Sequence, residues 1–159
     1  MRRLAKFLAT VGGLGYLPVA PGTAGSLVGL AIVALWPAHS HVVQWPILFF
    51  VFLLGVGSST RVERDLGTID PSCIIIDEVV GMWLTLLLVT PTSPTQFVVA
   101  FAGFRLFDIL KPPPLKQLAR LPRGWGVMLD DLGAAVYAGL AMMILKALLM
   151  GILIAGHGR

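Results

Sequence analysis

Long apolar segments separated by short polar ones dominate this chain. Five apolar segments have the length of helices, and they cover residues 27–36, 42–57, 73–89, 96–110 and 130–155. Prolines at 37 and 112–114 end the first and the fourth, because proline lacks the amide donor that a helix interior needs. The last segment would extend about 39 Å at 1.5 Å per residue, enough to cross a hydrocarbon core of about 30 Å. The pattern predicts an all-α membrane bundle of about five apolar helices with short loops.

The polar segments predict the loops of this bundle, at residues 1–26, 58–72, 90–95 and 111–129. In the first of them, Pro18 and Pro21 interrupt the chain, so we expect an ordered loop there rather than a regular helix. In the last, the Gly-Trp-Gly sequence at 124–126 predicts a turn. The final helix is therefore expected to open at Asp130.

Composition places the chain in a membrane. Of its 159 residues, 57% are hydrophobic and 13% are charged, which is far from the average soluble domain. The length suits one domain spanning residues 1–159. The net charge of +4 suits an anionic lipid surface. No nucleic-acid partner is expected, because the basic residues lack the stacking aromatic side chains of a nucleic-acid-binding face.

Charge is distributed unevenly between the two ends of the predicted bundle. If the apolar segments cross the membrane in succession, all eight acidic residues fall on one side. Every basic residue except Lys146 and Arg159 falls on that side too, whereas His39, His41 and His157 fall on the other. The positive-inside rule makes the charged side cytoplasmic. The sequence thus predicts a multi-pass protein whose functional surface faces the cytoplasm.

Carboxylates occur where an apolar helix should least tolerate them. Asp77 and Glu78 are adjacent and lie between two apolar runs. A buried carboxylate stays ionised only when a cation, a metal or hydrogen-bond donors hold it. With helices running alternately up and down, Asp108 and the pair Asp130–Asp131 reach the same membrane level as Asp77 and Glu78. An all-oxygen set of this kind favours magnesium or manganese.

Helix capping is the alternative for Asp77, Asp130 and Asp131, because a carboxylate at a helix N-terminus accepts backbone hydrogen bonds and meets the positive end of the dipole. Capping explains one acid per helix. It does not explain both pairs together with Asp108, so metal binding is favoured.

Arg105, Asp108 and Lys111 are spaced three residues apart and therefore share one edge of a helix. Arginine matches phosphate oxygens as a bidentate fork, whereas lysine offers a point charge. The alternative is an intrahelical ion pair with an interfacial anchor. Lys111 suits both interpretations equally, and Arg105 is the stronger candidate for phosphate.

Residues 21–26 read Pro-Gly-Thr-Ala-Gly-Ser and lead into a predicted helix N-terminus. Free backbone amides and the hydroxyls of Thr23 and Ser26 could bind an anion there. Simple capping of the helix by Ser26 is the alternative, and the spacing alone favours it.

Four sequence blocks carry a family resemblance. They are Pro-Gly-Thr-Ala-Gly-Ser at 21–26, Asp70 with Ile-Asp-Glu-Val-Val-Gly-Met-Trp at 76–83, Phe-Arg-Leu-Phe-Asp-Ile-Leu-Lys-Pro at 104–112 and Gly-Val-Met-Leu-Asp-Asp at 126–131. In this order and spacing, the chain resembles the bacterial phosphatidylglycerophosphatase A family. The resemblance implies an all-helical, magnesium-dependent phosphatase of the bacterial inner membrane. Such an enzyme removes the terminal phosphate of phosphatidylglycerophosphate to give phosphatidylglycerol.

The catalytic hypothesis assigns one or two Mg²⁺ ions to the predicted catalytic and metal-ligating carboxylates, Asp77, Glu78, Asp108, Asp130 and Asp131. Four further residues would hold the phosphate of the membrane phospholipid, namely Arg105, Lys111, Thr23 and Ser26. The sequence leaves open whether water or a carboxylate is the nucleophile, and it does not predict an oligomeric state.

The competing class is a non-enzymatic membrane protein that binds or transports magnesium. A transporter needs polar groups along a path across the bilayer. Mid-membrane positions offer little beyond Thr85 and Lys146, so the phosphatase is favoured.

Overall fold

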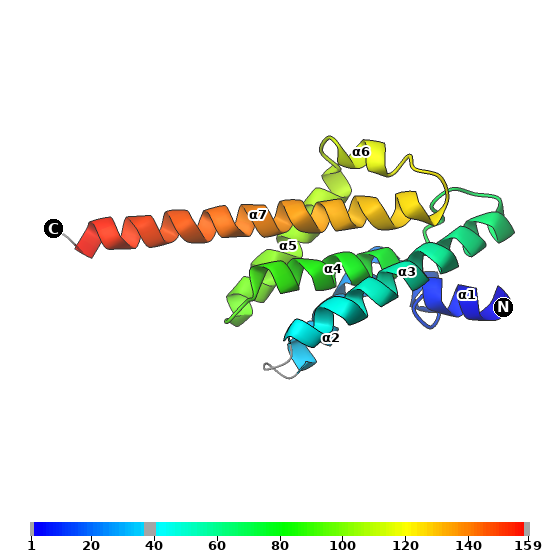
Figure 1. Cartoon of the computed structure of the whole chain (residues 1–159), viewed down its shortest axis with the longest axis horizontal. Coiled ribbons are helices and arrows are strands. Elements are labelled where there is room, and N and C mark those ends of the chain that lie inside the picture. The colour runs from blue at the N-terminus through cyan, green and yellow to red at the C-terminus, as the bar shows by residue number, and fades with distance from the viewer. Residues whose placement is uncertain (1, 37–40, 158–159) are drawn as a thin grey trace.

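The computed structural model describes residues 2–36 and 41–157, and the side chains of 2–36 and 42–151. Helices account for the regular structure of these residues and no strand occurs among them, which confirms the all-helical prediction. The helices are α1 Arg2–Ala9, α2 Pro21–Leu35, α3 His41–Leu66, α4 Ile76–Val89, α5 Pro94–Leu110, α6 Leu115–Leu118 and α7 Gly124–His157, with a 3₁₀ turn at Leu14–Tyr16 (Figure 1). The predicted positions of His39 and Arg159 lie outside the described residues, as do the side chains of His41 and His157.

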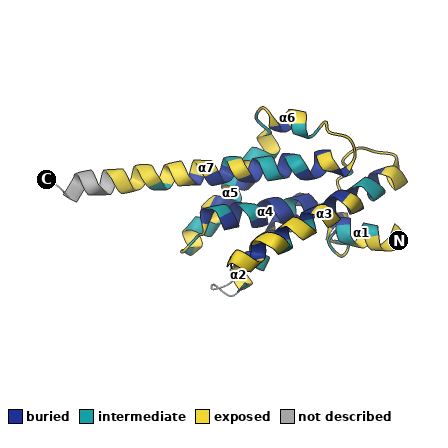
Figure 2. Ribbon diagram, viewed as in Figure 1, coloured by how far each residue is buried: buried dark blue, intermediate teal, exposed yellow. Residues whose placement is uncertain are grey.

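Helix α4 lies at the centre of the bundle, in contact with α2, α3, α5 and α7. Eleven of its 14 residues are buried, and Figure 2 shows it largely dark blue between more exposed neighbours. Its apolar side chains form the core together with residues such as Phe104 and Met128. Within this core, the Trp83 indole of α4 donates to Gln44 Oε1 of α3 at 2.8 Å. A helix surrounded in this way has its rotation fixed by packing.

Glycines bring α2 very close to α4. A Cβ atom added at Gly25 would lie 2.7 Å from the carbonyl oxygen of Ile75, and one at Gly29 would lie 2.5 Å from that of Val79. Small residues at such crossings let two helix backbones approach more closely than side chains would permit. The start of the chain is tied to the same region, because the amide of Ile75 donates to the carbonyl of Ala9 at 2.9 Å.

The predicted loop at residues 1–26 is wrong at both of its ends. Residues Arg2–Ala9 form α1, and α2 already begins at Pro21. Proline is compatible with the first helical position, because the donor it lacks would have no partner there. Ser26 therefore lies inside α2 rather than at its N-cap, and its hydroxyl donates to the carbonyl of Gly22 at 3.0 Å.

The two charged loops are also shorter than predicted. Helix α3 continues to Leu66 instead of ending near residue 57, and α7 begins at Gly124 instead of Asp130. Each extension is stabilised by a contact: Arg61 pairs with Asp65 one turn later, and the amide of Gly124 donates to Thr60 Oγ1 at 3.0 Å. The predicted turn at 124–126 is therefore the first turn of a helix.

Two helical segments, Val42–Leu66 and Gly124–Gly151, are long and apolar enough to cross a membrane. Helices α2, α4 and α5 have 15, 14 and 17 residues. At 1.5 Å per residue they extend about 21–26 Å, less than a hydrocarbon core of about 30 Å. The structure therefore supports two candidate membrane crossings, whereas the sequence predicted about five apolar helices that cross.

Replacement of Gly29 by alanine should separate α2 from α4. The new methyl group would meet the Val79 carbonyl oxygen at 2.5 Å, so we expect the free energy of unfolding to fall by about 1–3 kcal/mol. Denaturant unfolding in detergent, followed by circular dichroism, measures this change. The matched control is Gly151→Ala in α7, where an added Cβ meets no atom within 4 Å and stability should not fall. Equal stability of Gly29→Ala and wild type would contradict the close helix contact.

Candidate functional site

A polar cavity of about 360 Å³ opens where α4 begins and α5 ends. Its walls come from the start of α2, the 70–74 segment, α4, the end of α5 and α7. Five carboxylates and two cations line it, namely Asp70, Asp77, Glu78, Asp108 and Asp131 with Arg105 and Lys111. Segments far apart in the sequence thus bring an excess of negative charge to one place.

Asp77 and Glu78 occupy the first turn of α4, and α2 packs against Glu78. The N-cap of α4 is Ile75, which makes no side-chain capping bond, so neither acid occupies the N-cap position. Gly22 permits the close approach of α2, because a Cβ atom there would overlap Glu78 Oε1 and lie 3.3 Å from Arg105 Nη1. Gly22 of the 21–26 block therefore forms part of the cavity wall.

Three carboxylates form a compact cluster. One oxygen each from Asp77, Glu78 and Asp131 can be chosen so that all three lie within 4.8 Å of one another. Asp77 Oδ1, Glu78 Oε2 and Asp131 Oδ2 are buried and accept no hydrogen bond from the described residues. Burial, followed by the nearby charges of Glu78 and Asp131, raises the pKa of Asp77 well above its usual value. Buried oxygens without donors are suited to a hard divalent cation, so these residues could hold a metal ion.

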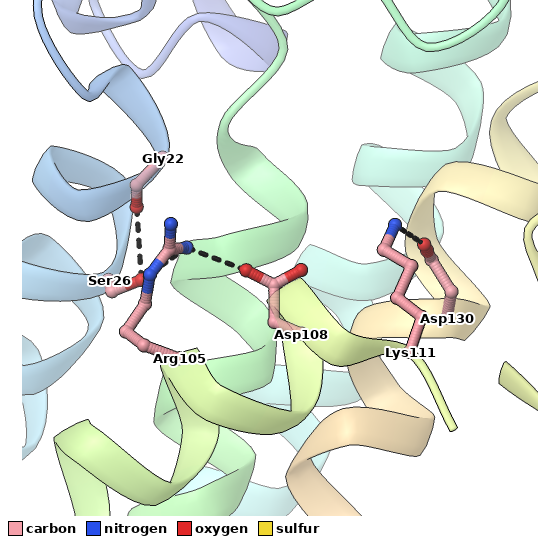
Figure 3. Close-up of polar contacts among 6 residues, drawn as sticks. All are labelled: Gly22, Ser26, Arg105, Asp108, Lys111 and Asp130. Carbon is pink, nitrogen blue, oxygen red and sulfur yellow. Dashed lines mark hydrogen bonds and ion pairs between the residues drawn. The ribbon is translucent and has the colours of Figure 1, made fainter. Parts of the chain in front are cut away.

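Arg105 is held by two partners at the edge of the cluster. Its Nη1 donates to Asp108 Oδ2 at 2.7 Å and to Ser26 Oγ at 3.4 Å, as Figure 3 shows. The Ser26 hydroxyl in turn donates to the Gly22 carbonyl. The predicted intrahelical pair of Arg105 and Asp108 is present, and it leaves other guanidinium donors for a ligand.

Lys111 ends α5 in a left-handed conformation, with φ of 43°, and forms an ion pair with Asp130 of α7 (Figure 3). Burial opposes the charge of the lysine, but the hydrogen bond and the charge of Asp130 outweigh it and raise the pKa of Lys111 above its usual value. Lys111 therefore stays protonated at the cavity wall. Asp130 itself is buried behind it and does not line the cavity.

The structure divides the predicted site residues into three groups. Six line the cavity, namely Asp77, Glu78, Asp108, Asp131, Arg105 and Lys111. Asp130 and Ser26 lie behind them, each in contact with one of the two cations. Thr23 does not line the cavity. The capping alternative is wrong for Asp130 and Asp131, because α7 begins six residues before Asp130.

Sequence reasoning missed Asp70 and Ser72, which also line the cavity. Asp70 has a left-handed backbone, with φ of 48°, and its amide donates to Glu63 Oε1 at 3.0 Å. Its position therefore depends on a buried carboxylate in α3. The available signal was the place of Asp70 in the second family block, seven residues before Asp77.

Comparison with known proteins identifies the family that the chain resembles. The family model described as phosphatidylglycerophosphatase A matches residues 7–146. Proteins named phosphatidylglycerophosphatase A from Haemophilus influenzae and Escherichia coli are 36% and 37% identical to the chain. The first match covers 87% of this chain and 86% of the relative, and the second covers 81% and 76%.

A third relative has a different name. The Bacteroides thetaiotaomicron protein named "Putative phosphatidylinositol-3-phosphatase" is 34% identical over 150 residues, which cover 90% of this chain and 94% of that protein. No solved structure matches the chain. The extent of the family match and the two relatives that carry its name show that the chain belongs to the phosphatidylglycerophosphatase A family.

Proposed function

We propose that this protein hydrolyses the terminal phosphomonoester of phosphatidylglycerophosphate to give phosphatidylglycerol. The observation that carries the proposal is the cavity in which three clustered carboxylates lie beside Arg105 and Lys111, in a chain of this family. A phosphomonoester needs positive charge around its oxygens, and the cavity offers two cations together with a cluster suited to a third. The single domain of residues 1–159 would contain the whole site.

The metal site of this proposal narrows to three of the five predicted carboxylates. Asp77, Glu78 and Asp131 would hold Mg²⁺, because their buried oxygens have no donors among the described residues. Asp108 and Asp130 each pair with a cation of the chain and would orient it instead. When bound, Mg²⁺ would supply Lewis-acid charge that stabilises the phosphate oxygens during hydrolysis.

The two cations of the chain have separate tasks in this proposal. Arg105 would bind the phosphate through the guanidinium donors that Asp108 and Ser26 leave unused. Lys111, kept protonated by Asp130, would contribute a fixed positive charge at the opposite wall. Arg105 lies in the last two turns of α5 and Lys111 is its C-cap, so their spacing is set by the end of one helix.

The site would lie at the cytoplasmic face of the bacterial inner membrane, where a lipid keeps its tails in the bilayer while its head group enters the cavity. Two candidate crossings and the one-sided charge support this location. A transport role is less favoured, because the two mid-membrane polar residues identified from the sequence are each hydrogen-bonded to a carbonyl: Thr85 donates to that of Gly81, and Lys146 to that of Val89.

A second lipid phosphate is a candidate substrate because of the Bacteroides relative, whose name specifies phosphatidylinositol-3-phosphate hydrolysis. Both lipids present a phosphomonoester at a membrane surface.

The substrate test compares phosphate release from phosphatidylglycerophosphate and phosphatidylinositol 3-phosphate in detergent micelles. We expect wild type to prefer the first lipid, and Asp77→Asn to lower kcat by about 100-fold or more, because a cluster ligand is lost. Asp65→Asn on α3, outside the cavity, is the matched control and should retain activity. Full activity of a folded Asp77→Asn protein would refute the proposed site.

Direct metal binding tests the carboxylate cluster without the reaction. Calorimetric titration of the full chain in detergent should detect Mg²⁺ binding that Asp131→Asn weakens by about 10–100-fold, since one of three ligands becomes a neutral amide. Asp65→Asn should bind as wild type does. Unchanged affinity in Asp131→Asn would place the ion elsewhere.

The role of Arg105 predicts a specific kinetic change. Arg105→Lys keeps the charge but removes the planar fork, so kcat/KM should fall by about 10–100-fold. Ser26→Ala removes only one hydrogen bond to that side chain and should cost less than about tenfold. If Arg105→Lys matches wild type in a steady-state assay, a bidentate phosphate contact is excluded.

A further inference from the structure

A second, apolar groove lies between α1 and α3, outside the carboxylate cavity. Its volume is about 420 Å³, and it shares no lining residue with that cavity. The apolar part of its lining comes from both helices and consists of Leu4, Ala5, Leu8, Leu53, Leu54 and Gly57. In Figure 1, α1 lies beside the half of α3 that leads to Leu66.

The apolar side chains that line this groove are exposed. Leu4 is 63% exposed, Leu53 42% and Leu54 38%. A Cβ atom added at Gly57 would meet no atom within 4 Å, so the glycine leaves open space in the middle of the groove. Covering apolar surface of this kind is favourable by about 25 cal/mol per Å². The groove is therefore shaped for an apolar occupant.

Positive charge surrounds one end of the groove. Arg61 lines it directly. A neighbouring pocket between the same two helices is lined by four cations and one carboxylate, namely Arg2, Arg3, Lys6 and Arg64 with Asp65. Asp65 offsets only part of this charge, through contacts of 3.3 Å to Arg61 Nε and 3.8 Å to Arg2 Nε. An occupant with an apolar tail and an anionic head would match both features.

We infer that the α1–α3 groove binds one acyl chain of an anionic phospholipid whose phosphodiester head group contacts Arg61 and the adjacent basic pocket. Basic pockets between membrane helices and amphipathic basic helices bind anionic lipids through this combination of apolar burial and charge. A zwitterionic lipid carries a compensating ammonium group and gains less from the cations. The inference rests on the proposed membrane location, but it does not depend on the proposed reaction.

The test is lipid retention by the full chain in detergent, measured by native mass spectrometry with dioleoylphosphatidylserine or dioleoylphosphatidylcholine added. Neither lipid carries a phosphomonoester, so binding is measured apart from hydrolysis. Wild type should bind one phosphatidylserine at least about tenfold more tightly than phosphatidylcholine. Both lipids carry a phosphodiester and an ammonium group, and only the serine carboxylate leaves a net negative charge for the cations. Arg61→Gln should reduce this preference.

Filling the groove distinguishes a site from general lipid adhesion. Gly57→Leu places a side chain in the open space and should lower phosphatidylserine affinity at least about fivefold, since the occupant loses its apolar contact. Gly151→Leu, the same change at another open glycine on α7, is the matched control and should bind as wild type does. Equal retention of the two lipids, or an unchanged affinity in Gly57→Leu, would overturn the inference. Failure of the phosphatase assay would leave it intact.

Discussion

The close grouping of three carboxylates is the constraint on which the rest of the site depends. Asp77, Glu78 and Asp131 are held within a few ångströms of one another, with oxygens that no donor of the described residues satisfies. Such charges repel and lose hydration, so they require compensating positive charge. Arg105 and Lys111 cannot supply all of it, because each already shares its charge with another carboxylate. The negative charge that Arg105 and Lys111 leave uncompensated is the physical basis for the proposed metal cation.

Close helix packing creates this condition. Glycines on α2 let its backbone approach the start of α4 at Ile75 and Glu78, and Asp77 beside them is buried away from water. Interactions between charges are stronger in such a medium than in water. The ion pair of Lys111 with Asp130 joins the end of α5 to α7, whereas that of Arg105 with Asp108 lies within α5. They fix the direction from which a phosphate would meet each cation.

The start of the chain connects the two proposed sites. Helix α1 forms one wall of the lipid groove, and its last residue, Ala9, accepts a hydrogen bond from the amide of Ile75, directly before α4. Gly15 also packs against the carbonyl of Cys73. The helix that forms one wall of the α1–α3 groove thus contacts the segment from which α4 and Asp77 begin.

The sequence by itself determined the elements that depend on local chemistry. Apolar runs and prolines predicted the all-α class and the ends of α4 and α5, and the alternating helix directions predicted that distant carboxylates lie at one level. Tertiary contacts decided where α7 begins and which acidic side chains reach the cavity. Helix α7 starts at Gly124 because its amide reaches Thr60 of α3, and Asp70 reaches the cavity because Glu63 holds its backbone. Adjacent residues of a helix point about 100° apart, so packing of α7 directs Asp131 into the cluster and Asp130 toward Lys111.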